Sequence, residues 1–245
     1  VDDSLCGELN ANINNIAVLY NQGNREWKED SIIPYLGYVD QKGEIKDWFF
    51  ESVLYLGLTA PGGRGFASNT SPANAQDWQW YLDRTFKESG DMQELDRAAR
   101  EVAEKMGQPD RKIKVFLMIP WPATKQSKFG VIDDSGETLN FNHEEIGKEA
   151  AVENRKKAVK WYIDNAIQLW NDNEYSNIEL VGFYWLWETL EAEAPYESEL
   201  IKYTGDLVHE EDLKYLWIPF YKANEFYNWK AFGFDMAVLQ PNYFF

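Results

Sequence analysis

The sequence has few of the residues that build metal and redox sites. Its 245 residues include one cysteine, Cys6, and two histidines, His143 and His209. A single cysteine excludes an intrachain disulfide and a cysteine-rich zinc site, and two histidines are too few for a three-histidine metal centre. We expect both histidines at the surface, and we expect no metal and no cofactor.

Basic residues are also scarce. Lysine and arginine total 24 against 41 aspartates and glutamates, which leaves a net charge of −17. This balance argues against DNA, RNA and anionic membrane surfaces as partners, because binding to phosphates depends on clustered basic side chains. No apolar run approaches the ~20 residues of a membrane span, since even the richest stretch, residues 181–190, contains Glu188. We therefore expect no membrane insertion.

Apolar runs and helical patterns alternate along the chain. Six runs rich in β-branched and aromatic residues are typical of strands buried on both faces of a parallel sheet, namely 14–20, 53–60, 113–120, 178–187, 214–220 and 235–240. Between them the spacing predicts helices at 75–88, 91–106, 144–170, 197–211 and 224–232. The segment Val39 to Ile45 departs from the alternation and predicts a β-hairpin turn, while Pro34 disfavours a long helix before it.

This alternation predicts an α/β fold of the (β/α)8, or TIM barrel, type over residues 1–245 as one domain. The doubly wound alternative is weakened because no Gly-x-Gly-x-x-Gly follows the first strand and no Walker-type phosphate loop is present. The chain reaches Phe245 directly after the sixth strand, however, and eight strands need two further strand–helix units. Either the barrel continues beyond Phe245, or the fold is not a closed barrel.

Glu188 is the candidate catalytic residue. It follows the apolar segment 181–187 at the carboxyl end of the fourth strand, where barrel enzymes place catalytic groups. Many retaining glycosidases of this architecture have their acid/base glutamate there. Trp185 and Trp187 flank Glu188, so we expect them to bury its carboxyl and favour the neutral form that a proton donor requires. The alternative is a strand-end glutamate that caps a helix or pairs with an arginine.

A glycosidase needs a second carboxylate, ~5 Å from the first for retention of configuration or ~6.5 to 9.5 Å for inversion. If that group belongs to a seventh strand, it lies outside this sequence. The candidates inside the sequence are Asp133, Asp134, Glu191, Glu193 and Glu225. Each could equally be a solvated loop acid, because 41 acidic residues compete for two roles.

Aromatic and polar residues near the strand ends are the candidate ligand contacts. Aromatic residues make up 16% of the chain, and tryptophan and tyrosine at an open rim stack on sugar rings. We expect substrate contacts from Trp121, Tyr184, Trp187, Trp217, Tyr221, Gln240, Asn242 and Tyr243. Ordinary packing under the loops is the alternative for each of them. Arg64, in a glycine-rich loop after the second strand, could bind a carboxylate such as a uronic acid or hold Glu188 in place.

Several motifs resemble a known bacterial family, catalogued as domain of unknown function four-eight-five-five. They span nearly the whole chain, at residues 34–40 (PYLGYVD), 47–52 (DWFFES), 183–188 (FYWLWE), 216–221 (LWIPFY) and 239–245 (LQPNYFF). The resemblance implies a secreted or cell-surface protein, a domain that continues past Phe245, and a genomic setting of carbohydrate degradation. It implies no catalytic residue. The start of the chain has no signal-peptide pattern, which fits a cytosolic protein or a processed secreted one.

These observations favour a barrel glycoside hydrolase that acts on a poly- or oligosaccharide, with Glu188 as proton donor. The alternative is a carbohydrate-binding or surface protein without catalysis on the same scaffold. A second carboxylate within glycosidase range of Glu188 separates the two. A third possibility, a cytosolic barrel enzyme of small-molecule metabolism, predicts a phosphate-binding loop after strands seven and eight.

Overall fold

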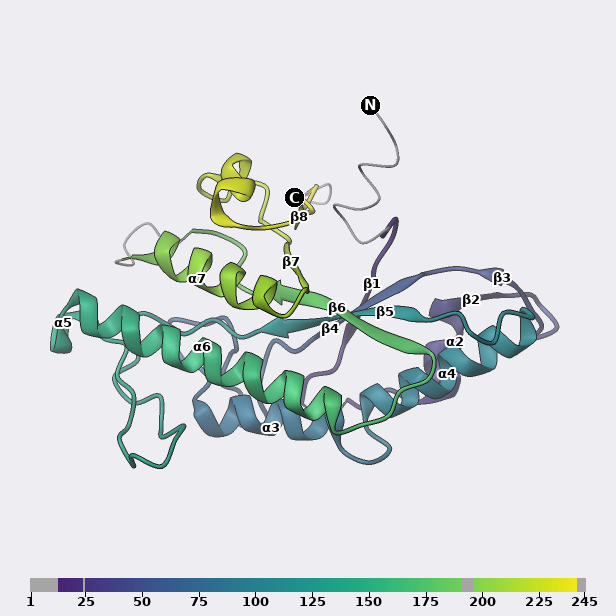
Figure 1. Ribbon diagram of the computed structural model, residues 1–245, viewed down its shortest axis with the longest axis horizontal. Helices are drawn as coiled ribbons and strands as arrows, with labels where there is room; N and C mark the ends of the chain where they lie inside the picture. Colours follow the sequence, from purple (N-terminus) through teal and green to yellow (C-terminus); the bar gives the residue numbers. More distant parts are fainter. Residues whose placement is uncertain (1–12, 24, 191–195, 242–245) are drawn as a thin grey trace.

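A computed structural model of the chain describes residues 13–23, 25–190 and 196–241 (Figure 1). Within them, six strands form one sheet in the order β1-β4-β5-β6-β7-β8, and every neighbouring pair is parallel. The strands are β1 (Ala17–Tyr20), β4 (Ser52–Leu56), β5 (Ile113–Ile119), β6 (Ile178–Trp185), β7 (Lys214–Trp217) and β8 (Met236–Ala237). All six predicted strands are present, and they pair in chain order.

The prediction of a closed barrel is wrong. In the described residues the sheet is open, with β1 at one edge and β8 at the other. A barrel closes only when its first and last strands pair, and that pairing also requires the tilt and stagger of an eight-stranded sheet. Here β8 is two residues long and pairs with β7 alone among the named strands. The alternation of strands and helices was interpreted correctly, but closure of the sheet was not.

The helices lie where their sequence signals place them. They are α2 (Glu29–Leu36), α3 (Ala75–Phe86), α4 (Asp91–Lys105), α5 (His143–Ile146), α6 (Lys148–Asn171) and α7 (Glu197–Glu210), followed by the 3₁₀ helix η1 (Phe226–Phe232). The predicted helix at 144–170 is divided at Gly147, whose φ of 86° is a left-handed value that interrupts the helix. Figure 1 shows α3 and α6 running side by side beneath the sheet.

The predicted hairpin is also confirmed. Strands β2 (Gly37–Val39) and β3 (Ile45–Trp48) form a separate antiparallel pair, and Gly43 in their turn has a φ of 82°. The helix before the hairpin, α2, contains Pro34 and is only eight residues long. The hairpin is therefore an insertion between the first two strands of the main sheet.

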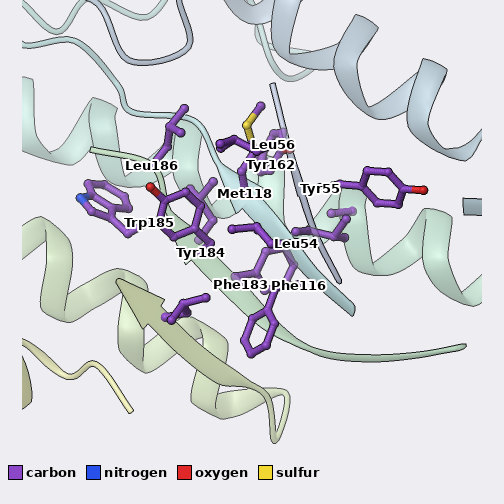
Figure 2. Packing of buried hydrophobic residues seen from close by; sticks show 14 of the residues in the cluster. Leu54, Tyr55, Leu56, Phe116, Met118, Tyr162, Phe183, Tyr184, Trp185 and Leu186 are labelled. Carbon is purple, nitrogen blue, oxygen red and sulfur yellow. The ribbon is translucent and has the colours of Figure 1, made fainter. Parts of the chain in front are cut away.

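The core lies on both faces of the central strands. Along β4, Tyr55 reaches the helix layer and donates its hydroxyl to the carbonyl of Asp91 at 2.9 Å. The register places Leu54 and Phe116 opposite each other on the other face, and both are fully buried. Figure 2 shows Phe116 and Tyr184 among the packed residues of this core. Burial on both faces explains why the central strands are continuously apolar.

Gly182 marks a close approach in the middle of the sheet, and we expect Gly182→Ala to destabilise the fold. An added Cβ would lie 2.2 Å from the carbonyl oxygen of Lys214 and 2.6 Å from the ring of Phe116. Overpacking of this kind costs about 1–3 kcal/mol of unfolding free energy, measurable by urea denaturation. Gly62→Ala is the control, because its nearest neighbour would be the Arg64 side chain at 3.6 Å. Equal losses for both variants would contradict the steric argument.

Candidate functional site

A cavity of about 370 Å³ opens at the carboxyl ends of the parallel strands. It is lined by residues that follow β4, β6 and β7, namely Leu58, Ala67, Leu186, Trp187, Glu188, Thr189 and Phe220. Crevices at this edge of parallel sheets are where ligands of α/β proteins bind. Five of the seven lining residues are apolar, and Glu188 carries the only charge among them.

Backbone hydrogen bonds tie the strand ends around the cavity to one another. They are Trp121 N to Phe66 O at 2.8 Å, Leu186 N to Ile119 O at 3.2 Å, Phe220 N to Glu188 O at 2.8 Å and Gln240 N to Pro219 O at 3.1 Å. Each bond joins the ends of two neighbouring strands of the sheet, or the segments that directly follow them. The cavity is therefore built on backbone segments that are hydrogen-bonded to one another.

Glu188 lines the cavity but is exposed, so the prediction that it is buried is wrong. The two tryptophans beside Glu188 pack against other residues. Trp185 is completely buried, and Trp187 stacks on Trp121 with ring centroids 4.1 Å apart and an angle of 11° between the planes. Neither ring covers the carboxyl, which can therefore meet a ligand directly.

Tyr184 lies beneath Glu188 and is 1% exposed. Burial, and to a smaller extent the negative charge of Glu188, raise the pKa of the Tyr184 hydroxyl above its usual value. This residue was predicted as a substrate contact, but it does not line the cavity. Tyr184 is therefore a buried, protonated residue of the core.

Two of the predicted rim tryptophans lie below the cavity. Trp121 is 2% exposed and donates its indole N–H to Oε1 of Glu197 at 2.9 Å. Trp217 is completely buried and donates its indole N–H to the backbone oxygen of Trp187 at 2.9 Å. Neither ring is available to stack on a ligand. Trp187, in contrast, lines the cavity. Trp121 stacks on its ring, and Trp217 donates a hydrogen bond to its backbone oxygen.

A buried ion pair supports this tryptophan cluster. Nη2 of Arg155, in α6, lies 2.7 Å from Oε2 of Glu197 at the start of α7, and their side chains are 2% and 4% exposed. Nε of Arg155 donates to the backbone oxygen of Pro122 at 2.8 Å. The pair therefore joins two helices to the end of β5. Sequence reasoning missed it because the partners lie 42 residues apart and no local pattern connects them.

Arg64 binds Asp77, which lies in α3. Its Nε and Nη2 atoms lie 2.5 and 2.7 Å from the two carboxylate oxygens of Asp77, a bidentate contact. Asp77 also accepts the backbone N–H of Asn74 at 2.9 Å, as part of the capping box that begins α3. The arginine thus ties the glycine-rich loop to a helix, and it does not hold Glu188.

Two of the remaining predicted contacts, Tyr221 and Gln240, do not line the cavity. Tyr221 is half-buried and its ring packs edge-on against Phe220 at 4.7 Å. Gln240 donates its side-chain amide to the backbone oxygen of Ile218 at 3.2 Å. Asn242 and Tyr243 lie outside the described residues. Phe220 lines the cavity but was not among the predicted ligand contacts. It directly follows a proline at a strand end, as Trp121 does, and this pattern could have identified it.

Comparison with known proteins places the chain in a family. The sequence model of the domain of unknown function DUF4855 matches residues 15–245. The chain belongs to the DUF4855 family. No curated protein and no solved structure matches it. The family description assigns no activity, so the function of this DUF4855 member is argued from its cavity.

Among the described residues, Glu188 is the only carboxylate that lines the cavity. Asp133 and Asp134 are exposed on a loop whose base is held to α3 by a hydrogen bond from Ala75 N to Phe129 O. Glu225 is connected more closely to the cavity. It follows Asn224, whose backbone N–H lies 3.3 Å from the hydroxyl of Thr189 in the cavity wall. Glu191 and Glu193 lie outside the described residues of this DUF4855 chain.

Two further features of the DUF4855 chain bear on its chemistry. In residues 13–23, 25–190 and 196–241, no group of three or more histidine, cysteine, aspartate or glutamate side chains is arranged to hold a metal ion. In the same residues, no helix combines the length and the apolar composition needed to cross a membrane.

Proposed function

We propose that this DUF4855 protein is a glycoside hydrolase that binds a poly- or oligosaccharide in the cavity, with Glu188 as proton donor. The observation that carries the proposal is the position of Glu188. Glu188 is exposed and lines a largely apolar cavity together with Trp187 and Phe220, at the carboxyl end of a parallel strand. A single carboxylate beside aromatic surfaces suits a ligand with both apolar faces and hydroxyl groups.

The aromatic and polar residues that line the cavity support binding of a sugar ring. The apolar face of a ring packs against Trp187 or Phe220, while its hydroxyl groups hydrogen-bond to Glu188 and Thr189. As proton donor, the Glu188 carboxyl must carry a proton when the glycan is cleaved. The proton then passes to the glycosidic oxygen as the bond to the leaving sugar breaks.

Hydrolysis also requires a second carboxylate to act as nucleophile or base. Glu225 is the described candidate linked to the cavity wall, through Asn224 and Thr189. Glu191 and Glu193 follow that wall along the chain. We propose that Glu225, Glu191 or Glu193 is the second carboxylate.

A second candidate function is glycan binding without catalysis. It is favoured by the finding that Glu188 alone among the described carboxylates lines the cavity. A binding protein uses the same aromatic surfaces but needs no proton donor. Under either function, the setting we propose is the bacterial cell surface or the medium outside it, and this rests on the family resemblance alone.

A glycan array followed by product analysis tests the proposal. Purified protein is screened for binding, and each bound glycan is then incubated with the protein and examined for new reducing ends. Turnover supports the hydrolase, and binding without turnover supports the alternative. If no glycan is bound or cleaved, both candidate functions are wrong.

We expect Phe220→Ala to weaken glycan binding by about 2- to 10-fold, the range of a single aromatic contact. Phe220 is 39% exposed and lines the cavity, so its removal takes away a stacking surface with little effect on the core. Tyr227→Ala is the matched control, because Tyr227 is 70% exposed and does not line the cavity. Affinities are compared by titration calorimetry. Equal affinity for the two variants would place the glycan elsewhere.

A further inference from the structure

The described residues that line the cavity supply one negative charge and no positive charge. Among its described lining residues, Glu188 is ionisable and the other six are neutral. The nearby arginine considered for an acidic ligand, Arg64, has two of its nitrogens committed to Asp77 at 2.5 and 2.7 Å. The chain as a whole carries a net charge of −17. The local and the overall charge therefore have the same sign.

This charge pattern discriminates between classes of sugar. A uronate, sulfate or phosphate group in the cavity would face Glu188 with no cation to balance it, and such like-charge contacts disfavour binding. A protonated amine would instead donate a charge-assisted hydrogen bond to the carboxylate. Because Glu188 is exposed, it can make that bond without rearrangement of the cavity.

We infer that the cavity selects glycans whose sugars carry a free, protonated amino group and rejects glycans that carry acidic groups. The inference rests on the proposed function and names its substrate class. It replaces the uronic acid considered for Arg64, because the structure assigns that arginine to Asp77. The inference concerns binding of the glycan by the ionised Glu188 carboxylate, whereas proton donation requires the neutral carboxyl.

The test compares matched oligosaccharides that differ only in one substituent. Free-amine, N-acetylated and uronate oligomers of the same length and linkage are titrated into the protein at a pH below the pKa of the amine. We expect the free-amine oligomer to bind about 2- to 5-fold more tightly than the acetylated one, the range of an exposed ion pair, and the uronate oligomer to bind most weakly. Added salt should reduce the differences between the three oligomers.

Two variants identify the source of the selectivity. Glu188→Gln should bring the affinity ratio of the free-amine and acetylated oligomers to about one, since the charge is lost while the stacking surfaces remain. Glu137→Gln makes the same change in net charge on an exposed loop outside the cavity, and it should keep the parent's ratio.

Three outcomes would overturn the inference. If uronate oligomers bind best, or if the three oligomers bind equally, the selectivity is wrong while glycan binding itself stands. If Glu188→Gln keeps the parent's ratio, the amine is recognised by another group. If no oligosaccharide binds in this test or on the array, the proposed function fails as well, so the two failures are distinguishable.

Discussion

Glu188→Gln is expected to slow hydrolysis of a matching neutral glycan by about 10²- to 10⁴-fold, the contribution of general-acid catalysis. The amide keeps the size of the side chain and its capacity for hydrogen bonds, but it has no proton to transfer. Because Glu188 is exposed and carries no core packing, the variant should fold as the parent does. Trp187 and Phe220 still line the cavity, so binding of the neutral glycan should be nearly unchanged.

The measurement is the rate of product formation at saturating glycan, with affinity measured separately by calorimetry. Glu137→Gln is the control for loss of one negative charge, and it should cleave at the parent's rate because Glu137 lies outside the cavity. Turnover by Glu188→Gln at the parent's rate would remove Glu188 from the mechanism. A loss of binding as large as the loss of rate would indicate that Glu188 holds the ligand and does not donate a proton.

The second large effect is expected at the buried ion pair. Glu197→Gln should lower the free energy of unfolding by about 3–5 kcal/mol, because it leaves the buried guanidinium of Arg155 without a countercharge. Glutamine can still accept the indole N–H of Trp121, which Glu197 accepts at 2.9 Å. The amide NH2 then faces Nη2 of Arg155, so the loss combines the missing charge with the missing hydrogen bond to Arg155. Urea denaturation of both proteins at neutral pH measures it.

Glu199→Gln is a closely matched control for this prediction. Glu199 lies on the same helix as Glu197 and pairs with Lys156, the residue after Arg155, at 2.5 Å. Its side chain is 50% exposed, so this substitution should cost at most about 1 kcal/mol. The two variants make the same chemical change at pairs that differ in burial. Similar losses at both positions would show that burial does not strengthen the Arg155–Glu197 pair.

The local architecture could be predicted because it depends on patterns that are complete within a few residues. A short apolar run such as residues 113–120 predicts a strand that is buried on both faces. The structure has this strand at Ile113–Ile119. The parallel order of the strands follows from the helices between them. The division of one predicted helix at Gly147 is a detail that the apolar spacing alone did not reveal.

Closure of the sheet could not be predicted in this way. Alternating strands and helices are compatible with both an open sheet and a barrel, and the difference lies in whether the two edge strands pair. In the described residues, β1 and β8 are at opposite edges. The apolar pattern of a strand indicates that its faces are buried, but it does not indicate how many neighbours the strand has.

The candidate site, like the fold, could be predicted only in part from the sequence. The sequence alone predicts that Glu188 follows a buried strand, because the apolar runs give the positions of the strands. It also predicts that the carboxyl ends of several strands meet near Glu188, because the helices between the strands make them parallel. The folded structure was needed to show that Glu188 is exposed, that Trp121 is buried, and that Arg64 binds Asp77. Trp121 meets its partner Glu197 across 76 residues of chain. Side-chain burial and pairing depend on such distant neighbours, which only the packing of the folded chain brings together.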